Sequence, residues 1–279
     1  MSRLIAILLL FALNLAVWSY EVPSGLSVTF IDVGQGDAIL LETPQVQVLV
    51  DGGPGSSVLA GLGDRLPFWD RTLDAVVATH PDADHTGGLS DVPERYPVAT
   101  LIEPGINNTT RAWGSFVDAT NKEIASGASH VVARAGMRLN LGAGAYVDIL
   151  YPDHDVTNID DTNSGSIVMR VVYGDTSFML TGDAPTAVEQ ELFLKYGYGL
   201  DSDVLKAGHH GSRTSSSADF VGSVSPAYAI FSRGCDNSYG HPHEGVVALF
   251  VSRAIKTFDT CTDGSISLVS DGRTVTRVE

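Results

Sequence analysis

The stretch that decides the fold reads Asp74-Ala75-Val76-Val77-Ala78-Thr79-His80-Pro81-Asp82-Ala83-Asp84-His85-Thr86-Gly87-Gly88. Its apolar, β-branched start predicts a buried strand that ends at Thr79. The six residues after it hold four candidate metal ligands: His80, Asp82, Asp84 and His85. A buried strand fixes its own backbone, and a tight loop directly after it can aim these side chains at one point. Imidazole and carboxylate hold Zn²⁺ or Mn²⁺, so the stretch predicts a metal site; a polar loop with coincidental charges is the alternative.

Strand and helix signals recur in two halves of the chain. In the first half, strands are expected over residues 26–33, 38–42, 46–50 and 73–79, and helices over 56–66, after Gly88 and over 113–125. In the second half, strands are expected over residues 131–133, 146–150, 167–172, 177–181, 204–207, 228–232 and 265–269, and helices over 186–196, 216–221 and 245–255. Two such sets predict an α/β fold in which two sheets pack face to face with helices on their outer faces. No linker interrupts the pattern after Gly25, which indicates one domain over residues 26–279.

The first 25 residues differ from the rest. No charged residue lies between Leu4 and Tyr20, and Arg3 precedes this run. A cation followed by an apolar run is typical of a membrane anchor or a secretory signal, and the lack of a clear small-x-small cleavage site favours the anchor. Both interpretations place the residues beyond Glu21 outside the cytoplasm, membrane-anchored or secreted. A buried core helix is the remaining alternative.

The composition limits how the protein can meet a nucleic acid. The formal net charge is −16, with 33 acidic and 17 basic residues, of which four are lysines. Such a surface repels phosphate backbones at long range, so binding through a broad basic face is excluded. Any contact with nucleic acid must come from metal ions and a few local cations. The acidic bias resembles that of proteins adapted to high salt, although solubility alone also explains it.

Cys235 and Cys261 are the only cysteines. They lack Cys-x-x-Cys spacing, which excludes a cysteine-rich zinc site. In an exported protein such a pair can form a disulfide, and two free buried thiols are the alternative.

Further motifs flank the metal loop. They read Asp32-Val33-Gly34-Gln35-Gly36-Asp37-Ala38, Val50-Asp51-Gly52-Gly53, Leu180-Thr181-Gly182-Asp183, Leu205-Lys206-Ala207-Gly208-His209-His210-Gly211-Ser212 and Tyr239-Gly240-His241-Pro242-His243. With His-x-Asp-x-Asp-His, they resemble the metallo-β-lactamase superfamily in the variant where Asp replaces the second His. In this order they resemble the β-lactamase-like domain of ComEC/Rec2 DNA-internalisation proteins over nearly the whole chain after Leu26. The resemblance implies the αββα sandwich of that superfamily, with two packed mixed β-sheets and outer helices.

The resemblance also implies two divalent metal ions, Zn or Mn. His80 and Asp82 would hold one ion, and Asp84 and His85 the other, with Asp183 as the bridging carboxylate. A plain Gly-Asp turn is the alternative for Asp183.

The late histidine ligand would be His209 or His210, and the Gly-His step favours His209. The superfamily's usual third-motif histidine is missing from residues 160–166, as in ComEC-like domains. One metal site therefore has more oxygen donors, which raises Mn²⁺ as a candidate. Six of the eight histidines, His80, His85, His209, His210, His241 and His243, fall into three clusters, which supports a metal site.

Four residues outside the ligand set are candidates for other roles. His241 is expected to contact a substrate phosphate or to donate a proton; a turn histidine that stabilises the helix near Glu244 is the alternative. Arg213 could bind phosphate, with a plain surface arginine as the alternative. Asp37 and Asp51 are expected to orient ligands rather than to bind metal.

The resemblance implies hydrolysis of a phosphodiester, with DNA, single-stranded or duplex, as the substrate. Metal coordination lowers the pKa of a bound water to about 7, and Asp84 would orient the nucleophile as a catalytic residue together with His241. A phosphorylcholine-esterase-type phosphodiesterase, which shares the Asp variant, and a catalytically silent DNA-binding module of a transport complex are the alternatives. The Asp variant and the missing histidine do not match β-lactam-hydrolysing enzymes. With at most one membrane segment, the chain would need a separate channel protein for DNA uptake.

Overall fold

The computed structural model describes residue 5 and residues 25–278. Within them, an eight-stranded sheet has the order β15-β14-β1-β2-β3-β4-β5-β6. The strands are β1 Leu26–Phe30, β2 Ile39–Glu42, β3 Gln47–Val50, β4 Leu73–Val77, β5 Val98–Glu103, β6 Ser129–Val132, β14 Ile266–Ser270 and β15 Val275–Val278. Strands β14 to β3 pair antiparallel, and β3 to β6 pair parallel. The sheet is therefore mixed.

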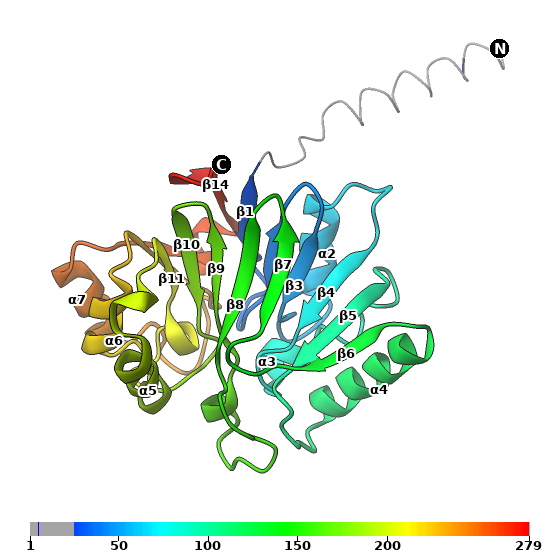
Figure 1. The fold of residues 1–279 in the computed structure, drawn as a ribbon, viewed down its shortest axis with the longest axis horizontal. Helices are drawn as coiled ribbons and strands as arrows, with labels where there is room; N and C mark the ends of the chain where they lie inside the picture. The colour runs from blue at the N-terminus through cyan, green and yellow to red at the C-terminus, as the bar shows by residue number, and fades with distance from the viewer. Residues whose placement is uncertain (1–4, 6–24, 279) are drawn as a thin grey trace.

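A seven-stranded sheet has the order β13-β12-β11-β10-β9-β8-β7. Its strands are β7 Arg138–Gly142, β8 Ala145–Tyr151, β9 Val168–Tyr173, β10 Thr176–Leu180, β11 Val204–Lys206, β12 Tyr228–Phe231 and β13 Lys256–Asp259. Strands β7 to β10 pair antiparallel and β10 to β13 pair parallel. This sheet is mixed as well, and the two sheets lie face to face (Figure 1).

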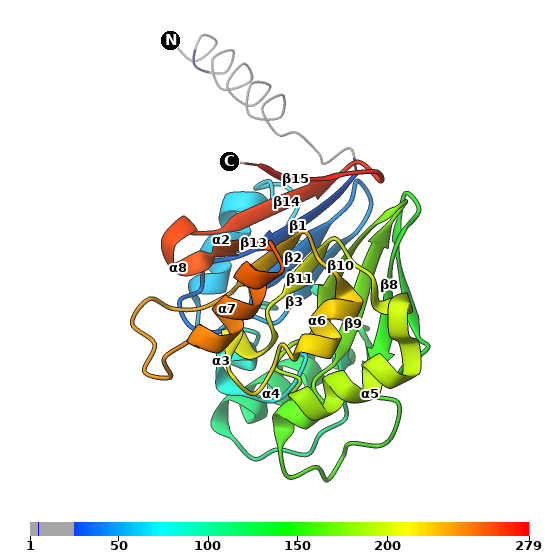
Figure 2. The same cartoon turned by 90° about the vertical axis from the view of Figure 1, so that its left-hand side faces the viewer.

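The helices cover the outer faces of the sheets (Figure 1 and Figure 2). They are α2 Ser57–Arg65, α3 Ala83–Thr86, α4 Arg111–Ala125, α5 Thr186–Tyr196, α6 Ala218–Val224, α7 Glu244–Ser252 and α8 Thr260–Asp263. Short 3-10 helices are η1 Thr162–Gly165, η2 Gly197–Leu200 and η3 Gly208–Gly211. The expected αββα sandwich is confirmed.

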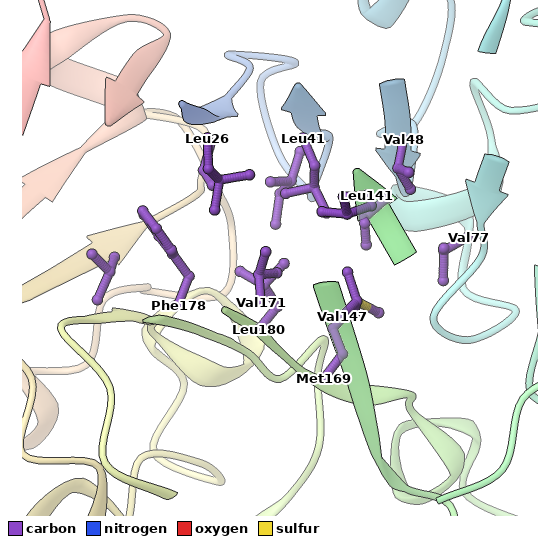
Figure 3. Packing of buried hydrophobic residues seen from close by; sticks show 14 of the residues in the cluster. Leu26, Leu41, Val48, Val77, Leu141, Val147, Met169, Val171, Phe178 and Leu180 are labelled. Carbon is purple, nitrogen blue, oxygen red and sulfur yellow. The ribbon is translucent and has the colours of Figure 1, made fainter. Parts of the chain in front are cut away.

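Strand alternation divides the apolar residues among three clusters. On β4, Ala75 and Val77 point into the cluster between the sheets, whereas Val76 packs under α2 and α4. Figure 3 shows Leu41 and Val77 of the first sheet near Val147 and Met169 of the second. A third cluster lies under α5, α6 and α7. Packing on both faces holds the central strands in place, and the loops of the site begin at their ends.

The prediction of a helix after Gly88 is wrong. A short helix, α3, instead lies inside the metal motif, and turns follow it. A Cβ at Gly87 would lie 2.4 Å from the Pro54 carbonyl oxygen, and one at Gly88 2.2 Å from that of Gly52. The chain needs both glycines for this close approach, so they mark tight packing rather than a helix start.

The apolar run from Leu4 to Tyr20 lies outside the described residues, apart from Ile5. In the part of the chain that the structure describes, no helix is both long and apolar enough to cross a membrane.

Candidate metal centre

Strand ends from both sheets position the candidate ligands. His80 lies three residues after β4, and α3 carries Asp84 and His85. In the second sheet, Asp183 follows β10, and η3 follows β11 with His209 and His210. Because β10 and β11 are parallel neighbours, their carboxyl ends place Asp183 beside the two histidines. The centre therefore forms where the C-terminal strand ends of the two sheets meet.

The side chains of three buried residues converge closely. The Nε2 atoms of His85 and His210 lie 3.3 Å apart. Asp183 reaches both, with Oδ1 3.3 Å from His85 Nε2 and Oδ2 3.3 Å from His210 Nε2. Together with Asp37, these residues form a buried group whose possible ligand atoms lie within 4.8 Å of one another. At the outer side, Asp84 Oδ2 lies 3.3 Å from His210 Nε2.

Hydrogen bonds on the far side of each imidazole leave Nε2 open for a metal. His85 Nδ1 lies 2.8 Å from Asp51 Oδ2, and His210 Nδ1 lies 2.8 Å from the Ser232 carbonyl oxygen. Both acceptors require an Nδ1–H, so the Nε2 lone pair of each neutral ring points into the centre.

The same arrangement extends to His80. Thr79 Oγ1 donates to Asp51 at 2.7 Å and so can accept from His80 Nδ1 at 3.0 Å. His80 Nε2 is buried and has no hydrogen-bond partner. Three imidazoles whose Nδ1 atoms are hydrogen-bonded and whose Nε2 atoms lie near carboxylate oxygens fit a divalent cation.

The charges of the centre stabilise one another. Burial opposes every charge, but His210, His85 and Lys206 hold the pKa of Asp183 well below its usual range. In turn, the charge of Asp183 overcomes burial and raises the pKa of His210 to about 10 and that of His85 well above its ordinary value. His80 behaves differently, because burial and the charge of His85 lower its pKa to about 3. Protons and a metal ion compete for the same Nε2 lone pairs of His85 and His210.

Lys206 is a member of the centre that sequence reasoning missed. It lies on β11, fully buried, with Nζ 2.6 Å from Asp37 Oδ2 and 3.4 Å from Asp183 Oδ1. Nζ also donates to the Gly182 carbonyl oxygen at 2.9 Å. A signal was available: one of only four lysines stands in the apolar run Val204-Leu205-Lys206-Ala207, directly before Gly208-His209-His210.

Asp37 and Asp51 lie behind the ligand atoms. Asp37 Oδ1 is 3.4 Å from His210 Nδ1, and its Oδ2 is paired with Lys206. Asp51 binds His85 Nδ1. Although Asp37 is within reach of a shared ion, its position on the Nδ1 side and its ion pair favour an orienting role, which stays a prediction.

His210 and His209 occupy different positions. Both have left-handed backbone angles, with φ 47° at His209 and 55° at His210. This turn buries His210 in the centre, while the His209 side chain stays 27% exposed, with Nε2 3.5 Å from Asp183 Oδ2. The geometry favours His210 as the ligand, against the preference that the Gly-His step suggested.

The part of the centre near His80 has fewer donors. Asp82 Oδ2 lies 3.8 Å from His80 Nε2, and Thr162 Oγ1 donates to the other Asp82 oxygen at 2.6 Å. Thr162 belongs to η1, in the segment where the superfamily's third-motif histidine is missing. A cation there would therefore depend more on carboxylate oxygen than one bound between His85 and His210.

His241 lies at the partly exposed side of the centre, which we call its mouth. Its ring lies 5.6 Å from that of His209, edge to face, and 6.4 Å from that of His210. Burial and the charge of His209 lower the pKa of His241 to about 4, so its imidazole is neutral at pH 7.

Arg213 is exposed, three residues beyond His210. His243 caps α7 by accepting from the Gly245 backbone N–H. The alternative role considered for His241, stabilising the helix near Glu244, is therefore filled by His243.

The fold and these residues define the class of protein. Residues 31–232 match the Metallo-beta-lactamase superfamily, and the chain belongs to this superfamily. Two solved structures share the fold. YhfI from Bacillus subtilis aligns with a TM-score of 0.51 and 14% identity over 84% of this chain and 95% of that one. CmlA, a diiron β-hydroxylase from Streptomyces venezuelae, aligns with a TM-score of 0.53 and 15% identity over 89% of this chain and 55% of that one. At such identities the likeness concerns the fold alone.

Among characterised sequences, the chain is similar to proteins of the ComEC/Rec2 family. It is 35% identical to competence protein ComA of Neisseria gonorrhoeae over 241 residues, 86% of this chain and 32% of that protein. It is 29% identical to ComE operon protein 3 of Bacillus subtilis over 257 residues, 86% of this chain and 32% of that protein. It is 34% identical to recombination protein 2 of Haemophilus influenzae over 222 residues, 78% of this chain and 25% of that protein. The chain thus spans about a third or less of these relatives, and the resemblance drawn from its motifs is confirmed.

Proposed function

We propose that this chain is a metal-dependent phosphodiesterase that cleaves DNA. The observation that carries the proposal is a group of buried Nε2 atoms: those of His85 and His210 each lie 3.3 Å from a carboxylate oxygen of Asp183, and that of His80 has no hydrogen-bond partner. Relatives named as competence and recombination proteins support DNA as the substrate.

The proposed centre would hold two divalent ions, Zn or Mn. His85, His210, Asp84 and Asp183 would hold one ion, and His80 and Asp82 the other, with Asp183 shared. His209, whose Nε2 lies 3.5 Å from Asp183 Oδ2, would be a further donor. When bound, such ions supply Lewis-acid charge and lower the pKa of water.

The chain's own residues then have distinct tasks. Asp84 is 29% exposed, and its Oδ2 lies 3.3 Å from His210 Nε2, where it can orient the attacking water. His241, neutral at pH 7, can hydrogen-bond a phosphate oxygen of the substrate from the mouth. Arg213 supplies a local cation for the same phosphate. Lys206 holds the carboxylates of Asp37 and Asp183 in place through its ion pairs with both.

For location, we propose that the apolar run 4–20 anchors the chain in a membrane with the hydrolase part outside the cytoplasm. A channel protein is the partner that we propose for DNA uptake. Protease treatment of intact cells tests this arrangement, because a domain that stays protected until lysis contradicts it.

One observation favours a second candidate. The net charge of −16 suits a small cationic head group better than it suits DNA. A phosphorylcholine-type phosphodiesterase would use the same metal centre and release a choline-like product.

A metal-reconstituted activity screen tests the proposal. Zn²⁺- and Mn²⁺-loaded protein is offered single-stranded DNA, duplex DNA, bis-p-nitrophenyl phosphate and a phosphorylcholine ester, at several salt concentrations because screening weakens the repulsion of a polyanion. Cleavage of DNA supports the nuclease. Cleavage of the choline ester with DNA intact supports the second candidate. DNA binding without hydrolysis under either ion would leave only a binding module.

A further inference from the structure

An aromatic side chain stands at the mouth of the metal centre and is not used in the proposed chemistry. The Tyr239 ring stacks on the His241 ring, with 5.6 Å between centroids and 24° between planes. Tyr239 is 69% exposed. Since His241 in turn contacts His209 edge to face at 5.6 Å, a line of rings leads from the centre to the surface. The outer face of Tyr239 is open to a planar ligand.

The loop that carries Tyr239 is fastened on several sides. The Asn237 side chain accepts from the His241 backbone N–H at 2.9 Å and donates to the His241 carbonyl oxygen at 2.9 Å. Cys235 forms a disulfide with Cys261 of α8. The Gly234 N–H donates to Gln35 Oε1 at 3.2 Å, which joins the loop to the segment just before Asp37. These ties hold the Tyr239–His241 pair at the mouth, so stacking there costs less ordering entropy than on a free loop.

The acidic charge of the protein makes an uncharged contact with DNA important. A net charge of −16 leaves little general attraction for a polyanion. Base stacking on an aromatic ring is an uncharged contact that acts on any base and does not depend on salt screening. It requires an unpaired base with a free face, which a duplex does not offer.

We propose that Tyr239, supported by His241, is a nucleobase-stacking subsite that selects single-stranded DNA. The subsite rests on the proposed function, because it names the form of the same substrate. A base stacked on Tyr239 places its neighbouring phosphodiester towards His241 and the metal ligands. Specificity for single strands then comes from one exposed ring rather than from a basic surface.

The test compares two single-stranded oligonucleotides of equal length, one with bases and one abasic. Both carry the same phosphates, so only stacking distinguishes them. Binding to the metal-loaded protein is measured by fluorescence anisotropy with slowly cleaved phosphorothioate linkages, and cleavage is measured with ordinary linkages. The variants are Tyr239→Ala, Tyr239→Phe and, as a matched control, Tyr198→Ala, which removes a 90% exposed tyrosine from η2 beside α5 and α6.

We expect wild type to bind the base-containing strand about 10- to 100-fold more tightly than the abasic strand, at low and high salt. Tyr239→Ala should remove this ratio, while Tyr239→Phe and Tyr198→Ala should keep it. An unchanged ratio in Tyr239→Ala, or equal affinity for both strands in wild type, overturns the subsite. Cleavage of both strands at equal rates would also overturn it while leaving the phosphodiesterase intact. If wild type discriminates the strands in binding but cleaves neither, the proposed catalysis fails and the subsite stands.

Discussion

Replacing Lys206 with Met removes a buried positive charge that, together with His85 and His210, offsets the buried carboxylates of the centre. Lys206 Nζ lies 2.6 Å from Asp37 Oδ2 and 3.4 Å from Asp183 Oδ1. At an effective dielectric constant of about 20, each contact attracts by roughly 5–6 kcal/mol. The cost of burying the ammonium group offsets much of this attraction. Loss of one partner from a buried pair leaves the other charge uncompensated, and we expect a loss of about 3–5 kcal/mol in the free energy of unfolding.

Urea unfolding in EDTA measures this loss as a lower midpoint at unchanged slope. The double variant Lys206→Met with Asp37→Asn should recover more than half of it, because both charges are then gone. Lys195→Met is the control: it removes an exposed lysine 2.9 Å from Asp153 and should cost less than about 1 kcal/mol. Added Zn²⁺ should narrow the gap between wild type and Lys206→Met, since the ion offsets the same carboxylates. A loss below about 1 kcal/mol for Lys206→Met would refute the reasoning.

Three further outcomes are expected. Asp84→Ala should abolish turnover of bis-p-nitrophenyl phosphate with an unchanged circular dichroism spectrum, and residual turnover near the wild-type rate would remove Asp84 from the mechanism. His241→Ala should lower kcat/KM by about 10²-fold, as for the loss of a substrate contact; an unchanged kcat/KM contradicts its role. Burial, opposed by the charge of Arg65, raises the pKa of Glu42 from 4.5 to about 7. Stability is therefore full below pH 4.5 and is lost as pH rises through 7, so Glu42→Gln should stabilise the protein at pH 8 by up to about 3 kcal/mol and have no effect at pH 4. Thermal unfolding at both pH values checks this, and equal shifts at pH 4 and pH 8 would contradict it.

Most strands with strong apolar patterns could be predicted from the sequence, and most weakly patterned ones could not. The central strands β1, β4, β9 and β10 are buried along nearly their whole length, and each was expected within a few residues of its observed bounds. Strands β5, β7, β13 and β15 were not expected. Most side chains of β7, β13 and β15 are exposed or half-buried and give no clear alternation, whereas β5 was missed although it is largely buried. They form because neighbouring strands offer hydrogen bonds, which a single sequence does not reveal.

Some features of the candidate site could likewise be predicted from the sequence, and others could not. The convergence of Asp183 with His85 of the metal motif could be predicted because each follows a strong strand. The choice between His209 and His210 depends on a left-handed turn that only the backbone reveals. Lys206 was missed because its role depends on Asp37, which is 169 residues away in the sequence.

The most direct test of the account is the position of bound metal. Crystals of the chain soaked in Zn²⁺ or Mn²⁺ can be measured at the absorption edge of the metal, where anomalous scattering marks each ion. The account predicts an ion about 2.0–2.2 Å from the Nε2 atoms of His85 and His210 and from a carboxylate oxygen of Asp183. An ion bound elsewhere, or no ion between these three side chains at saturating metal, would contradict the metal centre and the proposed function that rests on it.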